Sequence, residues 1–96
     1  MKLGFIGCGN MAKAMIKGIV ASGAVAPGEI YGSNATPEHA AAVAEEFGIN
    51  AGTNNITVAE NAGILFLSVK PYQYEAVIAE IRGAIRPEQT VVTIAP

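Results

Sequence analysis

Short apolar runs alternate with longer segments of helical period along this chain of 96 residues. The first apolar run, residues 3–6, ends at Gly7, and residues 10–22 then space their apolar side chains three and four positions apart. Gly23 provides a stop for that helix. The alternation continues to residue 94 and predicts strands at 3–6, 29–33, 49–53, 64–69 and 90–94. Strands that alternate with helices favour an α/β fold with a parallel sheet.

Helix start and stop signals lie between the later strands. Thr36 and Pro37 are typical of an N-cap and a first helical position, and Gly48 closes the segment that they begin. Either Asn54 or Asn55 is expected to cap a short helix that ends at Asn61. A fourth helix is predicted from Pro71 onward, and Pro87 prevents its extension. Right-handed crossovers then give a Rossmann-like three-layer sandwich with strand order 3-2-1-4-5 and helices on both faces.

The composition excludes several classes of protein. With 51% hydrophobic and 15% charged residues, the chain is too apolar to be disordered. A net charge of -2 with six Lys and Arg residues provides no basic surface, so we expect no nucleic-acid partner. One Cys and one His cannot build a disulfide or a structural metal site. Glycines interrupt the apolar N-terminus and no run is long enough for a membrane span, which predicts a cytoplasmic protein.

Residues 7–12 match the pattern G-x-G-x-x-G/A, in which Ala12 fills the last position. The first glycine of this pattern makes a tight turn, and the second lets a pyrophosphate approach the backbone. The pattern alone is weak, but here it lies directly between the first predicted strand and the first long helix. The free N–H groups of that helix and its positive end therefore face the loop. This context predicts a dinucleotide-binding site.

The end of the second predicted strand bears on the choice between NAD and NADP. An NAD-selective site has an Asp or Glu here that holds the ribose 2'-hydroxyl, but the turn reads Ser33, Asn34, Ala35 and Thr36. Hydroxyl and amide groups at a helix N-terminus can instead accept a 2'-phosphate, which favours NADP. The alternative, that these residues serve only as turn and cap residues, stays open.

Three further residues could carry chemistry. Cys8 lies at a helix N-terminus, which could activate its thiol, but the turn also needs a small residue, and packing is the favoured interpretation. His39 has no ligand or acid at suitable spacing, so we expect a solvated surface role. Lys70 follows the most apolar strand at the edge where such sheets bind ligands, and it either faces a cleft or is simply solvated.

Three segments resemble the pyrroline-5-carboxylate reductase family: FIGCGNMA at residues 5–12, Ser33 with Asn34, and LSVKPYQ at residues 67–73. The resemblance is to the N-terminal domain of that family and covers the whole chain. It implies hydride transfer from NAD(P)H to the C=N bond of 1-pyrroline-5-carboxylate, which gives L-proline in the last step of proline biosynthesis. The cofactor supplies the hydride, and the protein binds and orients it.

The resemblance also implies a set of cofactor-binding residues. Those expected around the pyrophosphate are Gly7, Cys8, Gly9, Asn10 and Met11. Those expected around the adenosine ribose and its 2'-phosphate are Ser33, Asn34 and Thr36. Those expected on the nicotinamide side are Asn55, Val69, Lys70 and Pro71. NADP is the expected cofactor. Family members often carry Arg, a cation for the 2'-phosphate, where this chain has Ala35, so strict preference for NADP is not expected and NAD stays open. No catalytic residue is assigned, and Lys70 is not expected to be the proton donor.

In the family, a second, helical domain supplies dimerisation and most of the substrate pocket. Nothing in this chain corresponds to that domain, and no helix follows the last predicted strand to cover it. We therefore expect residues 1–96 to be the NAD(P)-binding domain of a longer homo-oligomeric enzyme, and to bind cofactor without turning over. Two alternatives stay open: a related NADP-dependent oxidoreductase, of the 3-hydroxyacid dehydrogenase or deazaflavin-dependent NADP reductase type, and a non-catalytic nucleotide-sensing domain.

Overall fold

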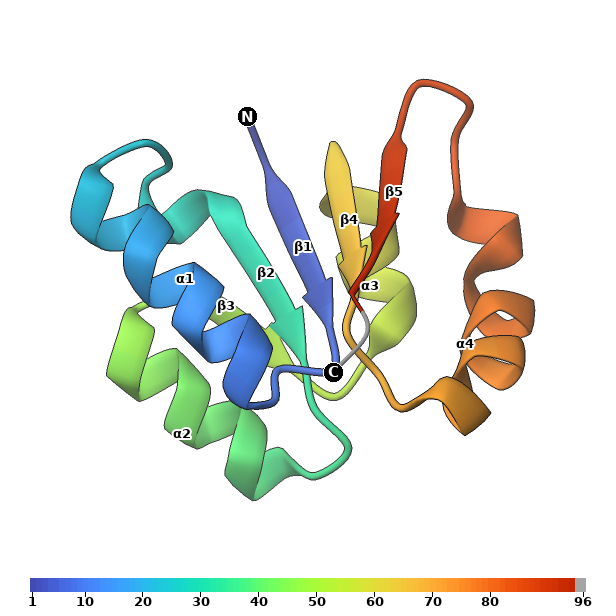
Figure 1. Ribbon diagram of the computed structural model, residues 1–96, viewed down its shortest axis with the longest axis horizontal. Helices are drawn as coiled ribbons and strands as arrows, with labels where there is room; N and C mark the ends of the chain where they lie inside the picture. Colours follow the sequence, from blue (N-terminus) through green and yellow to red (C-terminus); the bar gives the residue numbers. More distant parts are fainter. Residues whose placement is uncertain (95–96) are drawn as a thin grey trace.

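A five-stranded parallel sheet forms the centre of the computed structural model, which describes residues 1–94 (Figure 1). Its order is β3-β2-β1-β4-β5, as predicted. The strands are β1 (Leu3–Ile6), β2 (Ile30–Ser33), β3 (Asn50–Gly52), β4 (Ile64–Leu67) and β5 (Thr90–Thr93). The strand predicted to reach Val69 ends at Leu67, because Leu67 pairs with Ile6, the last residue of β1. Beyond it, the Ser68 hydroxyl donates to the carbonyl oxygens of Ile6 and Gly7, at 3.1 and 2.5 Å.

Four α-helices connect the strands, and their ends follow the predicted signals. They are α1 (Asn10–Ser22), α2 (Pro37–Phe47), α3 (Asn55–Asn61) and α4 (Tyr74–Ile81). Thr36 caps α2 by accepting from the backbone N–H of His39, and Asn54 rather than Asn55 caps α3. Gly23 and Gly48 end α1 and α2 in the left-handed conformation, with φ of 75° and 72°.

Short 3-10 turns account for several of the remaining differences in element boundaries. Pro27–Glu29 forms such a turn, so β2 begins at Ile30 rather than at residue 29. Pro71–Gln73 forms another before α4, because the Gln73 side chain accepts from the backbone N–H of Lys70 at 2.9 Å. A third, Arg82–Ala84, follows α4. The third strand is shorter than predicted, at Asn50–Gly52, and the fifth ends at Thr93 rather than at residue 94.

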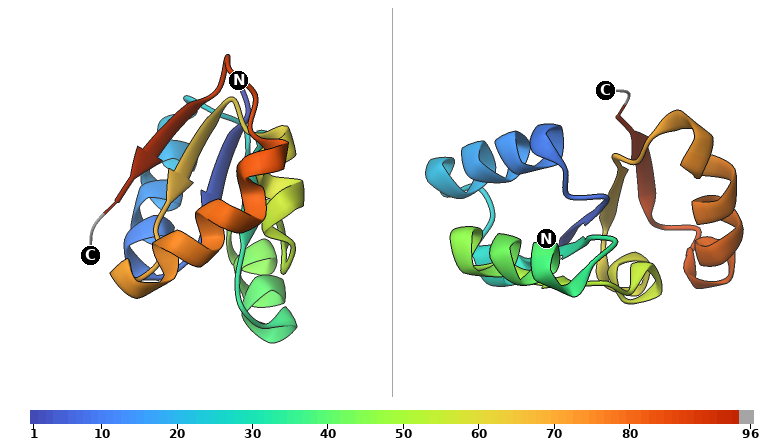
Figure 2. Two further views of the ribbon diagram at one scale, coloured as in Figure 1. Left: turned by 90° about the vertical axis from the view of Figure 1, so that its right-hand side faces the viewer. Right: turned by 90° about the horizontal axis from the view of Figure 1, so that it is seen from below.

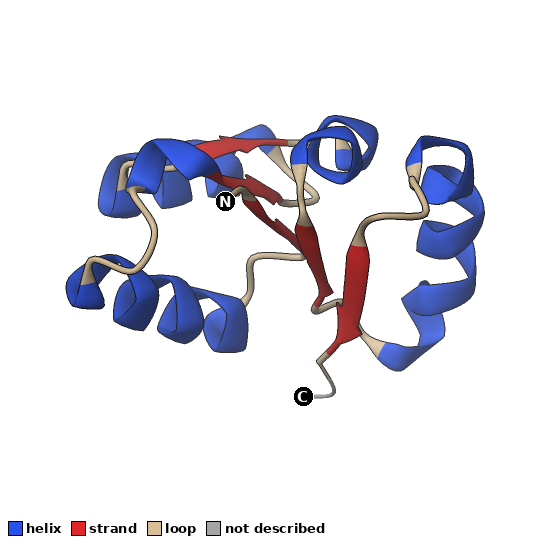
Figure 3. Ribbon diagram, turned by 90° about the horizontal axis from the view of Figure 1, so that it is seen from above, coloured by secondary structure: helices blue, strands red, loops and turns tan. Residues whose placement is uncertain are grey.

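The sheet separates two apolar clusters, one on each face, and helices cover both (Figures 2 and 3). Helices α1 and α2 pack on one face through Ala12, Ile16 and Val43. Helices α3 and α4 pack on the other through residues that include Val58 and Val77. Strand β1 is buried along its whole length between these layers. The observed arrangement is therefore the predicted three-layer sandwich.

The outer strand β5 is exposed on both sides. Val91 and Val92 remain 44% and 36% exposed, as expected for a strand that no helix covers. Within residues 1–94, none of the helices has the length and hydropathy needed to cross a bilayer. The same residues contain no group of three or more His, Cys, Asp or Glu side chains arranged to hold a metal ion.

Candidate functional site

A cleft of about 460 Å³ lies where β1, β2 and β4 end. Parallel strands point their carboxyl ends to one edge of the sheet, and this is where ligands of such sheets bind. Predicted site residues that line the cleft are Gly7, Cys8, Gly9, Ser33, Asn34, Asn55, Val69 and Lys70. The others do not line it: Asn10 and Met11 are in the first turn of α1, Thr36 caps α2, and Pro71 begins the turn before α4.

In the loop between β1 and α1, the backbone N–H groups of the first three residues donate to carbonyl oxygens of the protein. Gly7 and Cys8 donate to the carbonyl oxygen of Ser33, at 3.1 and 3.0 Å, and Gly9 donates to that of Gly7 at 2.9 Å. Among the backbone hydrogen bonds of the described residues, none uses the N–H of Asn10 or Met11. The donors left for an anion therefore belong to the first turn of α1 rather than to the glycines that the pattern singles out.

The N-terminus of α1 differs from those of α2 and α3 in having no side-chain cap. Gly9 occupies its N-cap and has no side chain, and its first turn contains no acidic residue. The positive end of a helix of 13 residues is thus left open toward the cleft. This arrangement suits a phosphate group, because unpaired N–H donors and the helix dipole both favour negative charge.

The two glycines of the loop meet different surroundings. A Cβ atom at Gly7 would lie 2.9 Å from the Ser68 carbonyl oxygen and 2.9 Å from Val69 Cγ1, and Gly7 has a φ of +87°. A Cβ atom at Gly9 would meet nothing within 4 Å. Gly7 therefore makes the turn, whereas the absence of a side chain at Gly9 leaves space that a ligand can enter. These are the two roles that the pattern predicts.

Ser33 and Asn34, at the end of β2, are polar residues that line the cleft. The Asn34 side chain donates from Nδ2 to the carbonyl oxygen of Cys8 at 3.1 Å, while its Oδ1 is buried with no hydrogen-bond partner. A buried acceptor without a partner is costly, so it favours a ligand that donates a hydrogen bond, such as a sugar hydroxyl. Ser33 is 1% exposed and donates its hydroxyl hydrogen to Asn55 Oδ1 at 2.6 Å.

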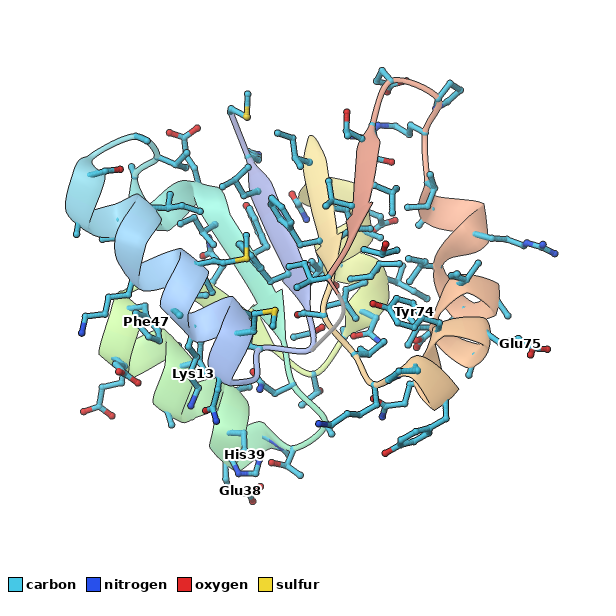
Figure 4. The ribbon with its side chains drawn as sticks, in the orientation of Figure 1. Lys13, Glu38, His39, Phe47, Tyr74 and Glu75 are labelled. Atoms are coloured by element: carbon cyan, nitrogen blue, oxygen red, sulfur yellow. The ribbon has the colours of Figure 1, made fainter. Side chains whose placement is uncertain are left out.

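Two basic residues that the sequence interpretation did not place in the site also line the cleft. Lys13 is half-buried on α1, and His39 lies in the first turn of α2. Both lie toward the same end of the molecule, one on each of the two helices, as Figure 4 shows. His39 is exposed, as expected for a surface residue. It also lines the cleft, as Ala35 does, which the sequence did not predict.

The imidazole of His39 is held by its own helix cap. Its Nδ1 lies 2.8 Å from Thr36 Oγ1, and that oxygen already accepts from the His39 backbone N–H at 3.3 Å. One of these two groups donates to the other, so the Thr36 hydroxyl holds the ring whichever ring nitrogen carries the hydrogen. Thr36 thus orients the imidazole at the rim of the cleft without lining it.

The thiol of Cys8 is a packing group. It is 2% exposed, and a Cβ atom added at Gly32 would lie only 2.6 Å from its sulfur. Burial raises the pKa of the Cys8 thiol to about 11 from an ordinary 9.0, although Ser33 and the charge of Lys13 act in the opposite direction. A thiol with a raised pKa is a poor nucleophile at neutral pH, which supports packing rather than reactivity.

This pKa predicts a loss of stability at high pH. Between pH 9 and 11 the Cys8 thiol ionises in the unfolded chain but stays protonated in the folded one, so the free energy of unfolding falls as pH rises. The full pKa difference corresponds to about 3 kcal/mol. Urea unfolding at pH 8 to 11 should show this loss in the natural chain relative to Cys8→Ala. Equal pH slopes in the two chains would contradict it.

Known proteins similar to this chain include pyrroline-5-carboxylate reductases from several organisms. The Escherichia coli (strain K12) enzyme is 45% identical over 94 residues, which are 98% of this chain and 35% of that protein. The Pseudomonas aeruginosa enzyme is 38% identical over 94 residues, which are 98% of this chain and 34% of that protein. The chain thus spans about a third of the length of these curated relatives.

Solved structures agree with the sequence comparison. A pyrroline-5-carboxylate reductase from Coxiella burnetii superimposes with a TM-score of 0.91 at 29% identity, covering 98% of this chain and 35% of that one. The Plasmodium falciparum pyrroline carboxylate reductase, solved with NADP bound, has a TM-score of 0.81 at 21% identity, covering 99% and 33%, and shares the fold. The resemblance inferred from the motifs is confirmed. Residues 2–96 match the model of the family described as NADP oxidoreductase coenzyme F420-dependent, and the chain belongs to that family.

Proposed function

We propose that the chain is the cofactor-binding domain of a pyrroline-5-carboxylate reductase and that it binds NADPH in the cleft at the ends of β1, β2 and β4. The proposal that the chain binds NADPH rests on the loop at residues 7–12. There the N-terminus of α1 has no side-chain cap and lies beside the open space at Gly9. The substrate part is supported by the 45% identity to the Escherichia coli enzyme across nearly the whole chain. The proposal includes the cytoplasmic location expected from the sequence.

The cleft fits the parts of a dinucleotide. The first turn of α1 has free N–H groups for the pyrophosphate, and the unpaired Oδ1 of Asn34 suits a ribose hydroxyl. Val69 and Lys70 line the other side of the cleft, beyond the loop, where we place the nicotinamide. NADPH bound there supplies a hydride for the carbon of a C=N bond, and a proton joins the nitrogen, so that the imine becomes an amine.

The residues of this chain bind and orient in that reaction. The carbonyl oxygen of Ser33 accepts from the N–H groups of Gly7 and Cys8 and so fixes the loop at the end of β2. The Ser68 hydroxyl, which follows β4, donates to the carbonyl oxygen of Gly7. We assign the substrate pocket, the proton donor and dimerisation to a second, helical domain of the full enzyme. The chain alone should then bind NADPH without oxidising it at an ordinary enzymatic rate when 1-pyrroline-5-carboxylate is added.

A chimera tests the substrate assignment. The chain replaces the matching third of the Escherichia coli enzyme, to which it is 45% identical, in a strain that cannot make proline. Growth without proline is the expected result, and the same chimera with Gly9→Val should not grow. A chimera that folds and binds NADPH but supports no growth would contradict the assignment. Reduction of another substrate, with or without coenzyme F420, would then favour the related oxidoreductases.

We expect Lys13 and His39 to favour NADPH over NADH. Both line the cleft, as Ala35 does, and their side chains have N–H groups that can donate to a 2'-phosphate, whereas Ala35 has none. Lys13→Ala should weaken NADPH binding about tenfold, the loss of one charge-assisted hydrogen bond of about 1.5 kcal/mol at a half-buried site. NADH binding should change little, since NADH has no 2'-phosphate. Lys17→Ala is the matched control, one helical turn away on α1 and exposed. Equal losses for NADPH and NADH in Lys13→Ala would contradict this role.

A further inference from the structure

Three side chains from three different elements form a hydrogen-bonded chain beside the cleft. Ser33, at the end of β2, donates from Oγ to Asn55 Oδ1 at 2.6 Å. Asn55, at the start of α3, donates from Nδ2 to Glu80 Oε1 on α4 at 2.8 Å. Ser33 and Asn55 line the cleft, whereas Glu80 does not. Glu80 can therefore influence a ligand there only through Asn55.

The carboxylate determines which way the Asn55 amide faces. A carboxylate only accepts hydrogen bonds, so the amide must turn its Nδ2 toward Glu80 and its Oδ1 toward Ser33. The Ser33 hydroxyl alone would not fix this choice, because a hydroxyl can donate to an amide oxygen or accept from an amide nitrogen. The orientation of Asn55 therefore depends on Glu80.

This orientation has a consequence for the cleft. Ser33 gives its only hydroxyl hydrogen to Asn55 and keeps lone pairs as acceptors, and Asn34 Oδ1 nearby is an acceptor without a partner. Asn55 keeps one amide hydrogen and one lone pair beyond its two bonds. With the amide reversed, Asn55 would donate to Ser33 and the Ser33 hydrogen would become available. The acceptor character of this end of the cleft is thus set from α4.

We propose that Glu80 is a positioning residue for the dinucleotide: it fixes the Asn55 amide, and so keeps Ser33 as an acceptor for a ribose hydroxyl. This inference rests on the proposed function, because the ligand is NADPH. Glu80 also carries a negative charge near an anionic ligand. If it acted only as a charge, its removal would strengthen NADPH binding slightly, since like charges repel. A positioning role predicts the opposite sign.

The test compares three variants of α4 by NADPH titration of the chain. Glu80→Ala should raise the NADPH dissociation constant about fivefold, the effect of one ordered hydrogen bond. Glu80→Gln should restore binding to within about twofold, because its amide oxygen can still accept from Asn55 Nδ2. Glu75→Ala is the matched control. It removes the same charge from the same helix, at a side chain that points outward, away from the sheet (Figure 4).

A second readout follows Asn55 directly in the chain without cofactor. In ¹⁵N NMR relaxation, the Asn55 side-chain amide should be ordered in the natural chain and in Glu80→Gln, and mobile in Glu80→Ala. Unchanged or tighter NADPH binding in Glu80→Ala, or an Asn55 amide that stays ordered there, would overturn the inference alone. A natural chain that binds no NADPH would instead overturn the proposed function, and the role of Glu80 with it.

Discussion

Gly9→Val should abolish dinucleotide binding while leaving the fold intact. A Cβ atom at Gly9 meets no protein atom within 4 Å, and the backbone there, with φ of -85° and ψ of -166°, suits valine. The side chain would instead occupy the space beside the first turn of α1, where the pyrophosphate has to approach the backbone. We expect NADPH affinity to fall by about a hundredfold or more, equivalent to about 3 kcal/mol.

Calorimetric titration with NADPH measures the binding, and urea unfolding of the same sample measures stability. Stability should fall by about 1 kcal/mol, because valine is a poorer N-cap residue than glycine. A Gly9→Val chain that binds NADPH as tightly as the natural one would show that the ligand does not approach this loop. A chain that unfolds would show that Gly9 has a structural role that its open surroundings do not predict.

Gly7→Val should have the second large effect, and on stability. Valine would have to adopt a φ of +87°, and its Cβ atom would lie 2.9 Å from the Ser68 carbonyl oxygen, which belongs to the backbone and cannot turn aside. Left-handed strain and overpacking together cost about 3 to 5 kcal/mol. The melting temperature should fall by about 15 °C or more in a domain of this size.

Gly18→Ala is the control for adding a Cβ atom to a glycine. Gly18 lies within α1 and a Cβ atom there meets nothing within 4 Å, so alanine should stabilise the helix by about 0.5 to 1 kcal/mol. Differential scanning calorimetry of the two variants makes the comparison. A Gly7→Val chain that melts within a few degrees of the natural one would contradict the assignment of Gly7 as the obligatory turn.

The fold was predictable because local signals agree with one another along the chain. Strand order followed from the alternation of strands and helices, and Gly23, Gly48 and Thr36 end or begin helices where expected. The apolar spacing of the helices does not by itself predict burial: Met11 on α1 and Ile78 on α4 are 42% and 45% exposed. Helical period places a side chain on a face, but whether another element covers that face depends on tertiary structure.

The site was predictable only in part, because sequence spacing does not say where side chains from separate helices meet. The motif located the loop, yet the N–H groups of Gly7, Cys8 and Gly9 turn inward, and the open donors lie one turn further on. In the sequence, Lys13 is one of two lysines four positions apart in the first helix, and only the fold shows that it lies at the cleft with His39. The link from Asn55 to Glu80 joins residues 25 positions apart, and no local pattern predicts it.

The central claim is that the chain binds a dinucleotide across the loop at residues 7–12 and the end of β2. The most direct test is an NMR titration of the chain with NADPH and, separately, NADH, following backbone amide shifts. We predict shifts at residues 7–12 with both cofactors and at residues 33–36 mainly with NADPH. A folded chain in which neither cofactor moves these amides would contradict the claim.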